Sequence, residues 1–492
     1  MRPTHPLTIS TKTYRDAIKA LNSLQSNYAN IKAIRESGIR KNEMALLEMK
    51  EWVKRIGYSV TDLNRLNVIH ITGTKGKGST AAFTSSILNE YRDKLHKIGL
   101  YTSPHLRNVR ERIRINGEPI SEEVFAKYFF EDWEKLDSTI SPLNEFPHML
   151  PGTKPGYFKF LTLLSFHVFL QEGCKTCVYE VGIGGAYDST NIVEKPLACG
   201  VSQLGIDHTF VLGDTIEEIA WNKGGIFKEG VPAFTVSGQP PNGLRVLQER
   251  AAERHTAVKV VPEYARLKKE RLGISGDFQR MNASLSVALA SQALSSLGIP
   301  ETRVSNDSDS VIPEKFVKGL YRTKWEGRCQ KLVRKGNSWY LDGAHTKESI
   351  EASSAWFRDT VKNSSSPKVL IFNQQGRDPK ALIRYLHDVI YQHVHFDYVI
   401  FTTNVTWSSG TYADDLVSIN VSQEDVKTLR VQNELREEWR KLDPNAVIYV
   451  SKSIEEAIKM VDKLGEGPLD IFVTGSLHLV GGVLVVFDGE SP

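Results

Sequence analysis

Residues 71–80 read ITGTKGKGST and directly follow the apolar stretch LNVIH at 66–70. The segment is similar to the phosphate-binding template G-x-x-x-x-G-K-[ST], in which a lysine follows the second glycine. If Gly73 and Gly78 are the two glycines, Ser79 occupies the lysine position and Lys77 comes before the second glycine instead of after it. Three interpretations fit these letters alone: a nucleotide site, a variant of one, or a flexible glycine-rich turn.

The sequence on either side of the loop favours a nucleotide site. LNVIHIT (66–72) is typical of a buried strand, and STAAFTSSILNEYR (79–92) has apolar residues at helical spacing. The loop glycines, among them Gly76, allow backbone N–H groups to approach phosphate oxygens, and the N-terminus of the following helix favours negative charge. Lys77 would then neutralise charge on the terminal phosphates. The order strand, glycine loop, helix therefore predicts nucleotide binding.

Length and charge limit the classes of protein that fit. A chain of 492 residues exceeds what one hydrophobic core usually organises, so at least two domains are expected. The net charge of +4 is too small to indicate nucleic-acid binding. The basic clusters VRERIRI (109–115) and RLKKER (266–271) are by themselves typical of solvated faces. No apolar run reaches the length of a membrane span, so none is expected.

The cysteines and the N-terminal segment bear on the compartment. Four scattered cysteines are too few for a disulfide framework and fit a reducing compartment: Cys174, Cys177, Cys199 and Cys329. The first two form a C-x-x-C at an expected helix-to-strand turn, where packing is a better interpretation than redox or zinc chemistry. The first fifteen residues are basic and lack acids, which is weakly similar to a transit peptide. A cytoplasmic location is expected, with the mitochondrial matrix as the alternative.

Short apolar strands alternate with amphipathic helices along the chain, which predicts an α/β fold with mostly parallel sheets. Residues 13–57 are expected to be helical, and strands are expected at 66–72, 97–101, 176–183, 198–205 and 232–236. A polar, irregular stretch at about 299–322 predicts a linker. Beyond it the alternation restarts, with strands expected in SWYLDG, KVLIFNQQG, YVIFTT, AVIYV, LDIFVTGS and VLVVF. We therefore expect one domain at 1–322 and a smaller α/β domain at 323–492.

Polar residues that follow the expected strands are candidates for a site, because ligands of open α/β sheets bind beyond the carboxyl ends of the strands. Glu180 lies near the end of an apolar strand, and Asp207 and His208 follow another. A buried carboxylate needs a partner, which magnesium or an arginine could provide. Lys223 lies among apolar and small residues in EEIAWNKGGIFK (217–228). A buried lysine must be paired, deprotonated or modified, and spacing does not choose among these.

Several longer motifs resemble those of the folylpolyglutamate synthase family, within the Mur ligase superfamily, in its eukaryotic form. In chain order they are ITGTKGKGST, YTSPHL, ERIRING, EVGIGGAYDSTN, GIDHTFVLGDTIEEIAWNKGGIFK, GVPAFT, WEGRCQ, LDGAHTKES and VTGSLHLVGG. The resemblance covers residues 14–482. The family loop reads G-T-x-G-K-G-S, with its lysine before the last glycine, as here. The resemblance implies a P-loop ATPase domain that binds ATP and folate and a Rossmann-like C-terminal domain that binds glutamate.

The resemblance also implies roles for individual residues. Lys77, Lys223 and His345 would be catalytic, and Lys223 would be carbamylated and would hold or orient magnesium. Mg²⁺ would be bound by Ser103, Glu180 and His208, and a monovalent cation is possible. Ser476 and His345 would lie near the incoming glutamate, and Arg110 would face the folate tail. ATP would be bound by Gly73, Thr74, Lys75, Gly76, Lys77, Gly78, Ser79, Arg328 and Asp342.

The implied reaction is ATP-dependent addition of L-glutamate to the γ-carboxyl of a (poly)glutamylated tetrahydrofolate, through an acyl phosphate, by a monomeric ligase. One alternative is dihydrofolate synthase, which joins the first glutamate to dihydropteroate with the same machinery. A non-catalytic P-loop binding module is a second alternative, although it would need neither DGAHT nor a buried lysine.

Three features depart from the family pattern or have no counterpart in it. Phe278 stands where a histidine is common, although Gln279 and Asn282 remain beside it, and Glu326 replaces a frequent proline. His387, His393 and His395 have no counterpart and are interpreted as a solvated helix end rather than a metal site.

Overall fold

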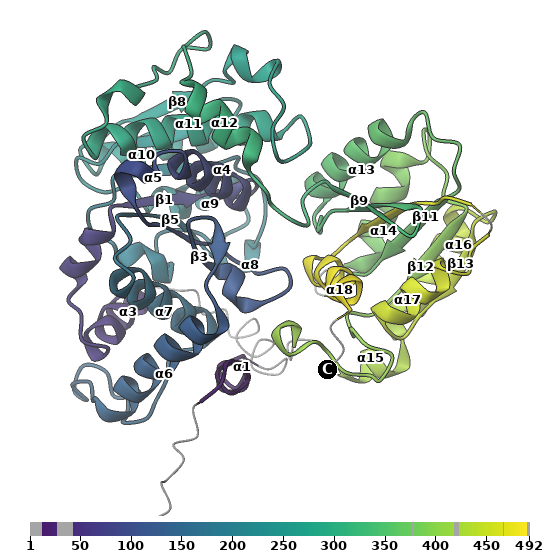
Figure 1. The fold of residues 1–492 in the computed structure, drawn as a ribbon, viewed down its shortest axis with the longest axis horizontal. Coiled ribbons are helices and arrows are strands. Elements are labelled where there is room, and N and C mark those ends of the chain that lie inside the picture. Colours follow the sequence, from purple (N-terminus) through teal and green to yellow (C-terminus); the bar gives the residue numbers. More distant parts are fainter. Residues whose placement is uncertain (1–11, 27–42, 376–377, 418–422, 466, 490–492) are drawn as a thin grey trace, which may run out of the picture.

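The computed structural model describes residues 12–26, 43–375, 378–417, 423–465 and 467–489. Figure 1 shows two lobes, each built on a sheet with helices on both of its faces. The first lobe contains an eight-stranded sheet and the second a six-stranded sheet. Within the described residues, no helix is both long enough and apolar enough to cross a membrane.

The first sheet has the order β4-β3-β2-β5-β1-β6-β7-β8. The six strands β2, β5, β1, β6, β7 and β8 pair in parallel, and β3 and β4 add an antiparallel edge next to β2. The carboxyl ends of β2, β5, β1 and β6 therefore meet at one edge of the sheet. The strand bounds are β1 Val68–Thr72, β2 Ile98–Tyr101, β3 Ile113–Ile115, β4 Glu118–Pro119, β5 Thr176–Glu180, β6 Ala198–Val201, β7 Ala233–Val236 and β8 Val258–Val261.

Both faces of the first sheet are buried, as expected for parallel strands between helices. Val68 packs into one core with helices α6 and α7, whereas Ile69 and Ile71 pack into the other with α4 and α11. Figure 1 shows these helix groups on opposite sides of the sheet. The helices of this lobe are α1 Tyr14–Asn22, α3 Met44–Arg55, α4 Lys77–Asn89, α5 Arg92–Leu95, α6 Glu122–Ser138, α7 Tyr157–Gln171, α8 Thr209–Leu212, α9 Ile216–Gly224, α10 Pro241–Ala252, α11 Gln279–Ser296 and α12 Glu314–Arg322, with 3₁₀ turns η1 Val60–Leu66, η2 Val109–Arg112, η3 Ser189–Ile192, η4 Ala265–Lys268 and η5 Pro300–Thr302.

The second sheet has the order β13-β12-β11-β14-β10-β9, and its strands are parallel except for the edge strand β9. Trp339 and Tyr340 are neighbours in sequence yet enter the two different cores of this lobe, as a two-residue period requires. The bounds are β9 Gln330–Arg334, β10 Asn337–Leu341, β11 Lys368–Phe372, β12 Tyr398–Phe401, β13 Val447–Val450, β14 Asp470–Thr474, α13 Lys347–Val361, α14 Pro379–Ile390, α15 Gln423–Thr428, α16 Arg430–Leu442, α17 Ile454–Val461, α18 Leu477–Asp488 and η6 Asp414–Leu416.

The α/β class and most of the strands expected from the sequence are confirmed, with shorter bounds. The strand expected in VLVVF (483–487) is wrong, because these residues lie in α18. Val483, Leu484 and Val485 are all buried, and a short apolar run of this kind does not distinguish a buried strand from a buried helix. Strands β3, β4, β8 and β9 are not predicted from the sequence; they are short or lie near sheet edges.

Two expectations concern segments outside the strands. Helices α1 and α3 lie in the stretch 13–57 that is expected to be helical, while residues 27–42 lie outside the described residues. The expected linker at 299–322 contains α12, whose Phe316 and Leu320 belong to the first-lobe core. The linker is therefore partly an ordered helix, and the domain boundary at 322 stays a prediction.

The prediction that Cys174 and Cys177 are packing residues is confirmed, whereas the prediction that the three histidines lie on a solvated helix end is partly wrong. Cys174 and Cys177 are buried, at the end of the α7-to-β5 turn and within β5. His387 is also buried, with its ring 4.4 Å from that of Tyr391 and 5.4 Å from that of Trp439. It is therefore a packing residue rather than part of a solvated helix end. His393 and His395 are exposed as expected.

Candidate functional site

The glycine loop joins β1 to α4 in a conformation that requires glycine. Gly73 and Gly76 have φ angles of 149° and 84°. A Cβ at Gly73 would lie 2.0 Å from Oγ of Ser202, and one at Gly76 would lie 2.1 Å from Oδ1 of Asn282. The chain after β6 and helix α11 thus press on the loop from outside. Such contacts fix the loop at the N-terminus of α4, whose first N–H groups lack helical partners.

Two lysines from different elements converge on one carbonyl group of this loop. The side-chain nitrogen of Lys77 donates to the carbonyl oxygens of Gly73 at 3.1 Å and Thr74 at 3.4 Å. Nζ of Lys223, on α9, donates to the same Gly73 oxygen at 2.7 Å. Burial lowers the pKa of Lys223 well below its usual range, and the nearby charge of Lys77 lowers it further. The site therefore favours the uncharged amine of Lys223.

Glu180 ends β5 beside the loop and is 4% exposed. Its Oε2 accepts a hydrogen bond of 2.9 Å from the backbone N–H of Ser103, which follows β2. Burial raises the pKa of Glu180, while the positive charge of Lys77, the N–H of Ser103 and the positive charge of Arg328 oppose that rise. The strand ends therefore place one buried carboxylate next to the glycine loop.

The chain after β6 contributes two further polar residues. Lys75 of the loop forms an ion pair of 3.1 Å with the buried Asp207. Asp207 also accepts a hydrogen bond of 2.8 Å from the backbone N–H of His208, which is exposed and precedes α8. In the described part of the chain, no three His, Cys, Asp or Glu side chains are grouped as a metal site. Ser103 and Glu180 are adjacent, and a carboxylate plus a hydroxyl fits Mg²⁺, which takes few protein ligands alongside phosphates and water.

The second-lobe candidates lie at the carboxyl ends of its strands. Asp342, after β10, accepts hydrogen bonds from the N–H groups of Cys329 at 2.8 Å and Ala344 at 2.9 Å. Burial raises the pKa of Asp342, and the charge of Arg328 counteracts this. Nδ1 of His345 lies 2.9 Å from the carbonyl oxygen of Gly343. Ser476 caps the N-terminus of α18 through a bond from the N–H of His478.

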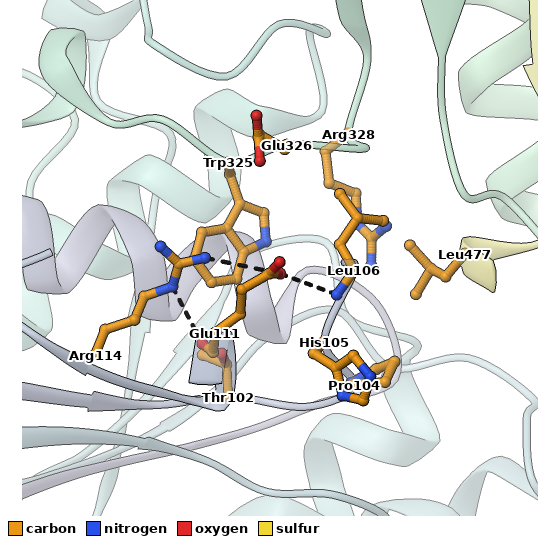
Figure 2. A pocket seen from close by; sticks show the side chains of 10 residues that line it. All are labelled: Thr102, Pro104, His105, Leu106, Glu111, Arg114, Trp325, Glu326, Arg328 and Leu477. Atoms are coloured by element: carbon orange, nitrogen blue, oxygen red, sulfur yellow. Dashed lines mark hydrogen bonds and ion pairs between the residues drawn. The ribbon is translucent and has the colours of Figure 1, made fainter. Parts of the chain in front are cut away.

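A pocket lies between the two lobes and brings residues of both together (Figure 2). Arg114 lies over the ring of Trp325, with 5.3 Å between the guanidinium carbon and the ring centroid. Glu111 accepts a hydrogen bond of 2.9 Å from the N–H of Leu106. Arg328 also lines the pocket, and its positive charge lowers the pKa of Glu180. The lining residues are Thr102, Pro104, His105, Leu106, Glu111, Arg114, Trp325, Glu326, Arg328 and Leu477.

The basic cluster at 109–115 is not a uniformly solvated face, which corrects the interpretation made from the sequence. Arg112 is 8% exposed, and its Nε donates to Nδ1 of His105 at 3.0 Å. Arg110 donates to the carbonyl oxygen of Ile120 at 2.9 Å and lies over the ring of Tyr14. These bonds hold both arginines in the fold instead of leaving them free in solvent.

Part of the pocket wall is not predicted from the sequence. Arg114 belongs to the cluster expected to be solvated, and Trp325 directly precedes Glu326, a departure from the family pattern. Phe278, the other departure, is 44% exposed, whereas Gln279 and Asn282 are buried beside the loop. The sequence does not predict that Arg110 lies over Tyr14 or that Arg114 lies over Trp325, because the partners of each pair are far apart along the chain.

Comparison with known proteins agrees with this architecture. The chain is 65% identical over 485 residues to a folylpolyglutamate synthase of Saccharomyces cerevisiae (strain FostersO), covering 98% of this chain and 88% of that protein. Residues 326–486 match the family model of the dihydrofolate synthetase C-terminal domain.

Solved structures share the fold at low sequence identity. Folylpolyglutamate synthase from Thermotoga maritima has a TM-score of 0.65 at 24% identity, over 94% of this chain and 97% of that one. Folylpolyglutamate synthase from Mycobacterium tuberculosis, complexed with ADP, has a TM-score of 0.68 at 21% identity, over 97% of this chain and 100% of that one. Together with the identity to the yeast protein across nearly the whole chain, this agreement shows that the chain belongs to the folylpolyglutamate synthase family.

Proposed function

We propose that this protein is an ATP-dependent ligase that adds L-glutamate to the γ-carboxyl group of (poly)glutamylated tetrahydrofolate, with ADP and phosphate as the other products. One observation carries the proposal within this family. A glycine loop at a helix N-terminus lies beside the buried carboxylate of Glu180 and the buried amine of Lys223, at the edge that faces the pocket between the lobes.

The reaction needs activation because a carboxylate is a poor electrophile. The γ-phosphate of ATP is transferred to the γ-carboxylate of folate, which gives an acyl phosphate and ADP. The α-amine of glutamate attacks the acyl carbon, and the tetrahedral intermediate expels phosphate as the amide forms. No protein nucleophile is required, so the protein acts by positioning the reactants and by offsetting negative charge.

Residues of both lobes would handle ATP. The loop from Gly73 to Ser79 would hold the triphosphate through its N–H groups, with Lys77 offsetting charge on the terminal phosphates. Lys77 supports this role because its side chain folds back over the loop, onto the carbonyl groups of Gly73 and Thr74. Arg328 and Asp342 would contact the nucleotide from the second lobe. Contacts from both sides would exclude water from the acyl phosphate.

Ser103, Glu180 and His208 would hold Mg²⁺. The bound ion would offset charge on the phosphate oxygens. The chain itself orients Glu180, because the N–H of Ser103 occupies Oε2. Burial raises the pKa of Glu180, and a bound cation would stabilise its ionised form, because a buried carboxylate is costly unless it is paired.

Lys223 would carry a carbamate. Its neutral amine can attack the carbon of CO₂ and lose one proton, which yields an anion where a buried cation would be costly. Support comes from its lowered pKa and from the lysine charges around it. The carbamate would hold a second magnesium ion or orient the first.

The remaining assignments are less detailed proposals. His345 and Ser476 would lie near the incoming glutamate, and Arg110 would face the polyanionic folate tail. Partners would be folate polyglutamates and L-glutamate. A monomeric state, a monovalent cation, and a cytoplasmic or mitochondrial location remain predictions.

Dihydrofolate synthase is the second candidate, because the matched family model describes that enzyme's C-terminal domain. Phosphate release should be measured with ATP and glutamate, comparing tetrahydrofolate with dihydropteroate. Release with tetrahydrofolate, with a product one glutamate longer by mass spectrometry, supports the proposal. Release only with dihydropteroate assigns the second activity, and release with neither acceptor overturns both.

A further inference from the structure

A short segment of the second lobe around η6 reaches the first lobe and contacts α1 (Figure 1). The carboxylate oxygen Oδ1 of Asp415 accepts hydrogen bonds from the hydroxyl of Tyr14 at 2.6 Å and from the N–H of Val109 at 2.7 Å. The backbone carbonyl of Asp415 lies 2.8 Å from Nε2 of His105. One residue of the second lobe thus contacts three separate positions of the first.

The residue next to Asp415 behaves differently. Asp414 forms an ion pair of 3.1 Å with Arg15, and their side chains are 53% and 66% exposed. Exposed pairs of this kind contribute little, typically about 0–1 kcal/mol. Asp415, by contrast, is half-buried, and burial raises the pKa of its carboxyl group. The two neighbouring aspartates therefore form a matched pair for experiment.

Two of the three bonds of Asp415, those with His105 and Val109, end on the segment 102–112, which forms one wall of the pocket. Nδ1 of His105 accepts from the guanidinium of Arg112, so the proton resides on Nε2, which donates to the Asp415 carbonyl. The ring of His105 is thereby fixed between the two lobes. Ser103, two residues earlier, donates its N–H to Glu180.

Leu106 of the same segment packs into the apolar core of the second lobe. The approach is close, because a Cβ at Gly481 would lie 1.9 Å from the carbonyl oxygen of Leu106. The segment is therefore held at Ser103 by the first lobe and at His105, Leu106 and Val109 by the second. Its position depends on contact between the lobes.

We propose that Asp415 is a positioning residue for the ligase reaction: it fixes the segment 102–112 against the second lobe and thereby sets Ser103 and the pocket wall for catalysis. The inference rests on the proposed function. Loss of an outer partner that orients a reacting group typically lowers activity about 10–100-fold, and we expect that range for kcat of Asp415→Ala. Nucleotide affinity should change less than threefold, because the glycine loop lies outside this contact.

Four variants test the inference: Asp415→Ala, Asp415→Asn, Tyr14→Phe and the control Asp414→Ala. Asparagine keeps an acceptor oxygen, so Asp415→Asn should restore kcat to within about fivefold of wild type. Asp414→Ala should behave as wild type. Titration with ADP, melting temperature and kcat should be measured for each. Tyr14→Phe removes only a hydroxyl and serves if Asp415→Ala does not fold.

If Asp415 is purely structural, Asp415→Ala will have a lower melting temperature but the kcat of wild type, and Asp415→Asn will have no lost kcat to restore. That result would overturn the proposal. Equal kcat loss in Asp414→Ala would also overturn it. Amide hydrogen exchange gives a readout that does not depend on the proposed activity. Exchange at Val109 and the surrounding segment should rise at least tenfold in Asp415→Ala, which removes the acceptor of the Val109 N–H, and by a smaller factor in Tyr14→Phe, which keeps that acceptor, but not in Asp414→Ala. Unchanged exchange refutes the inference even if wild type proves inactive as a ligase.

Discussion

Nζ of Lys223 donates a 2.7 Å hydrogen bond to the carbonyl oxygen of Gly73, which lies 150 residues earlier in the chain. The same carbonyl group accepts from Lys77 at 3.1 Å. Two ammonium groups at one buried oxygen would repel each other, so one lysine should be uncharged or modified. Lys223 is the more buried partner and has the lowered pKa.

The first prediction is that Lys223 forms a carbamate. Protein equilibrated with ¹³C-bicarbonate should show a carbamate resonance by ¹³C NMR that is absent from Lys223→Arg, because a guanidinium does not react with CO₂. Lys228→Arg is the matched control, since burial also lowers the pKa of Lys228, to about 8, at a position that contacts Asn191 instead of the loop. Persistence of the resonance in Lys223→Arg would refute the assignment.

Lys77→Ala should reduce kcat by about 10²–10³, the cost of removing one preorganised electrostatic contact. The fold should persist, because the hydrogen bonds of the Lys77 side chain to Gly73 and Thr74 stay within its own loop. Circular dichroism and melting temperature check the fold, and phosphate release checks kcat. Lys318→Ala is the control for loss of a positive charge, because Lys318 lies on α12 and forms an ion pair with Glu90 at the surface. Near-normal turnover of Lys77→Ala would contradict the proposed ATP site.

The sequence predicts the strand, loop and helix around Lys77 because local periodicity and glycine spacing encode them. It cannot predict that Asn282 closes over Gly76, since the two are brought together only by packing of α11 on α4. For the same reason it does not reveal that Arg114 stacks on Trp325. The error at 483–487 has another cause: valine-rich runs favour strands locally, whereas burial on several sides of α18 stabilises a helix there.

Glu180→Gln should abolish most activity yet stabilise the protein in the absence of nucleotide and metal. The folded-state pKa of Glu180 is raised, so the folded state binds a proton more tightly than the unfolded state does. Its contribution to stability is therefore present below the unfolded pKa, near 4.3, and is lost as pH rises through the folded value. Glutamine is neutral throughout and can still accept the bond from Ser103.

Melting temperatures of Glu180→Gln and wild type, measured from pH 4 to pH 8, check this prediction. The difference in favour of the variant should be smallest at pH 4 and should grow toward pH 8. Glu326→Gln, an exposed pocket-wall change, is the control for removing one negative charge. A variant less stable than wild type at pH 8 would show that the charge of Glu180 is already compensated within the protein.

Gly76→Ala should impair the loop for two separable reasons. Its φ of 84° costs a residue with a Cβ about 1–2 kcal/mol, and that Cβ would also meet Oδ1 of Asn282 at 2.1 Å. Gly298 has a similar φ of 86° and no atom within 4 Å of its Cβ position, so Gly298→Ala measures the backbone cost alone. Gly76→Ala should therefore lower the free energy of unfolding more than Gly298→Ala does, and only Gly76→Ala should weaken ADP binding.

The double variant Gly76→Ala with Asn282→Ala separates the two costs. It should recover the steric part but not the backbone part. Its free energy of unfolding, corrected for the effect of Asn282→Ala alone, should therefore approach that of Gly298→Ala. Equal losses in the two single variants would show that Asn282 moves aside freely and does not fix the loop.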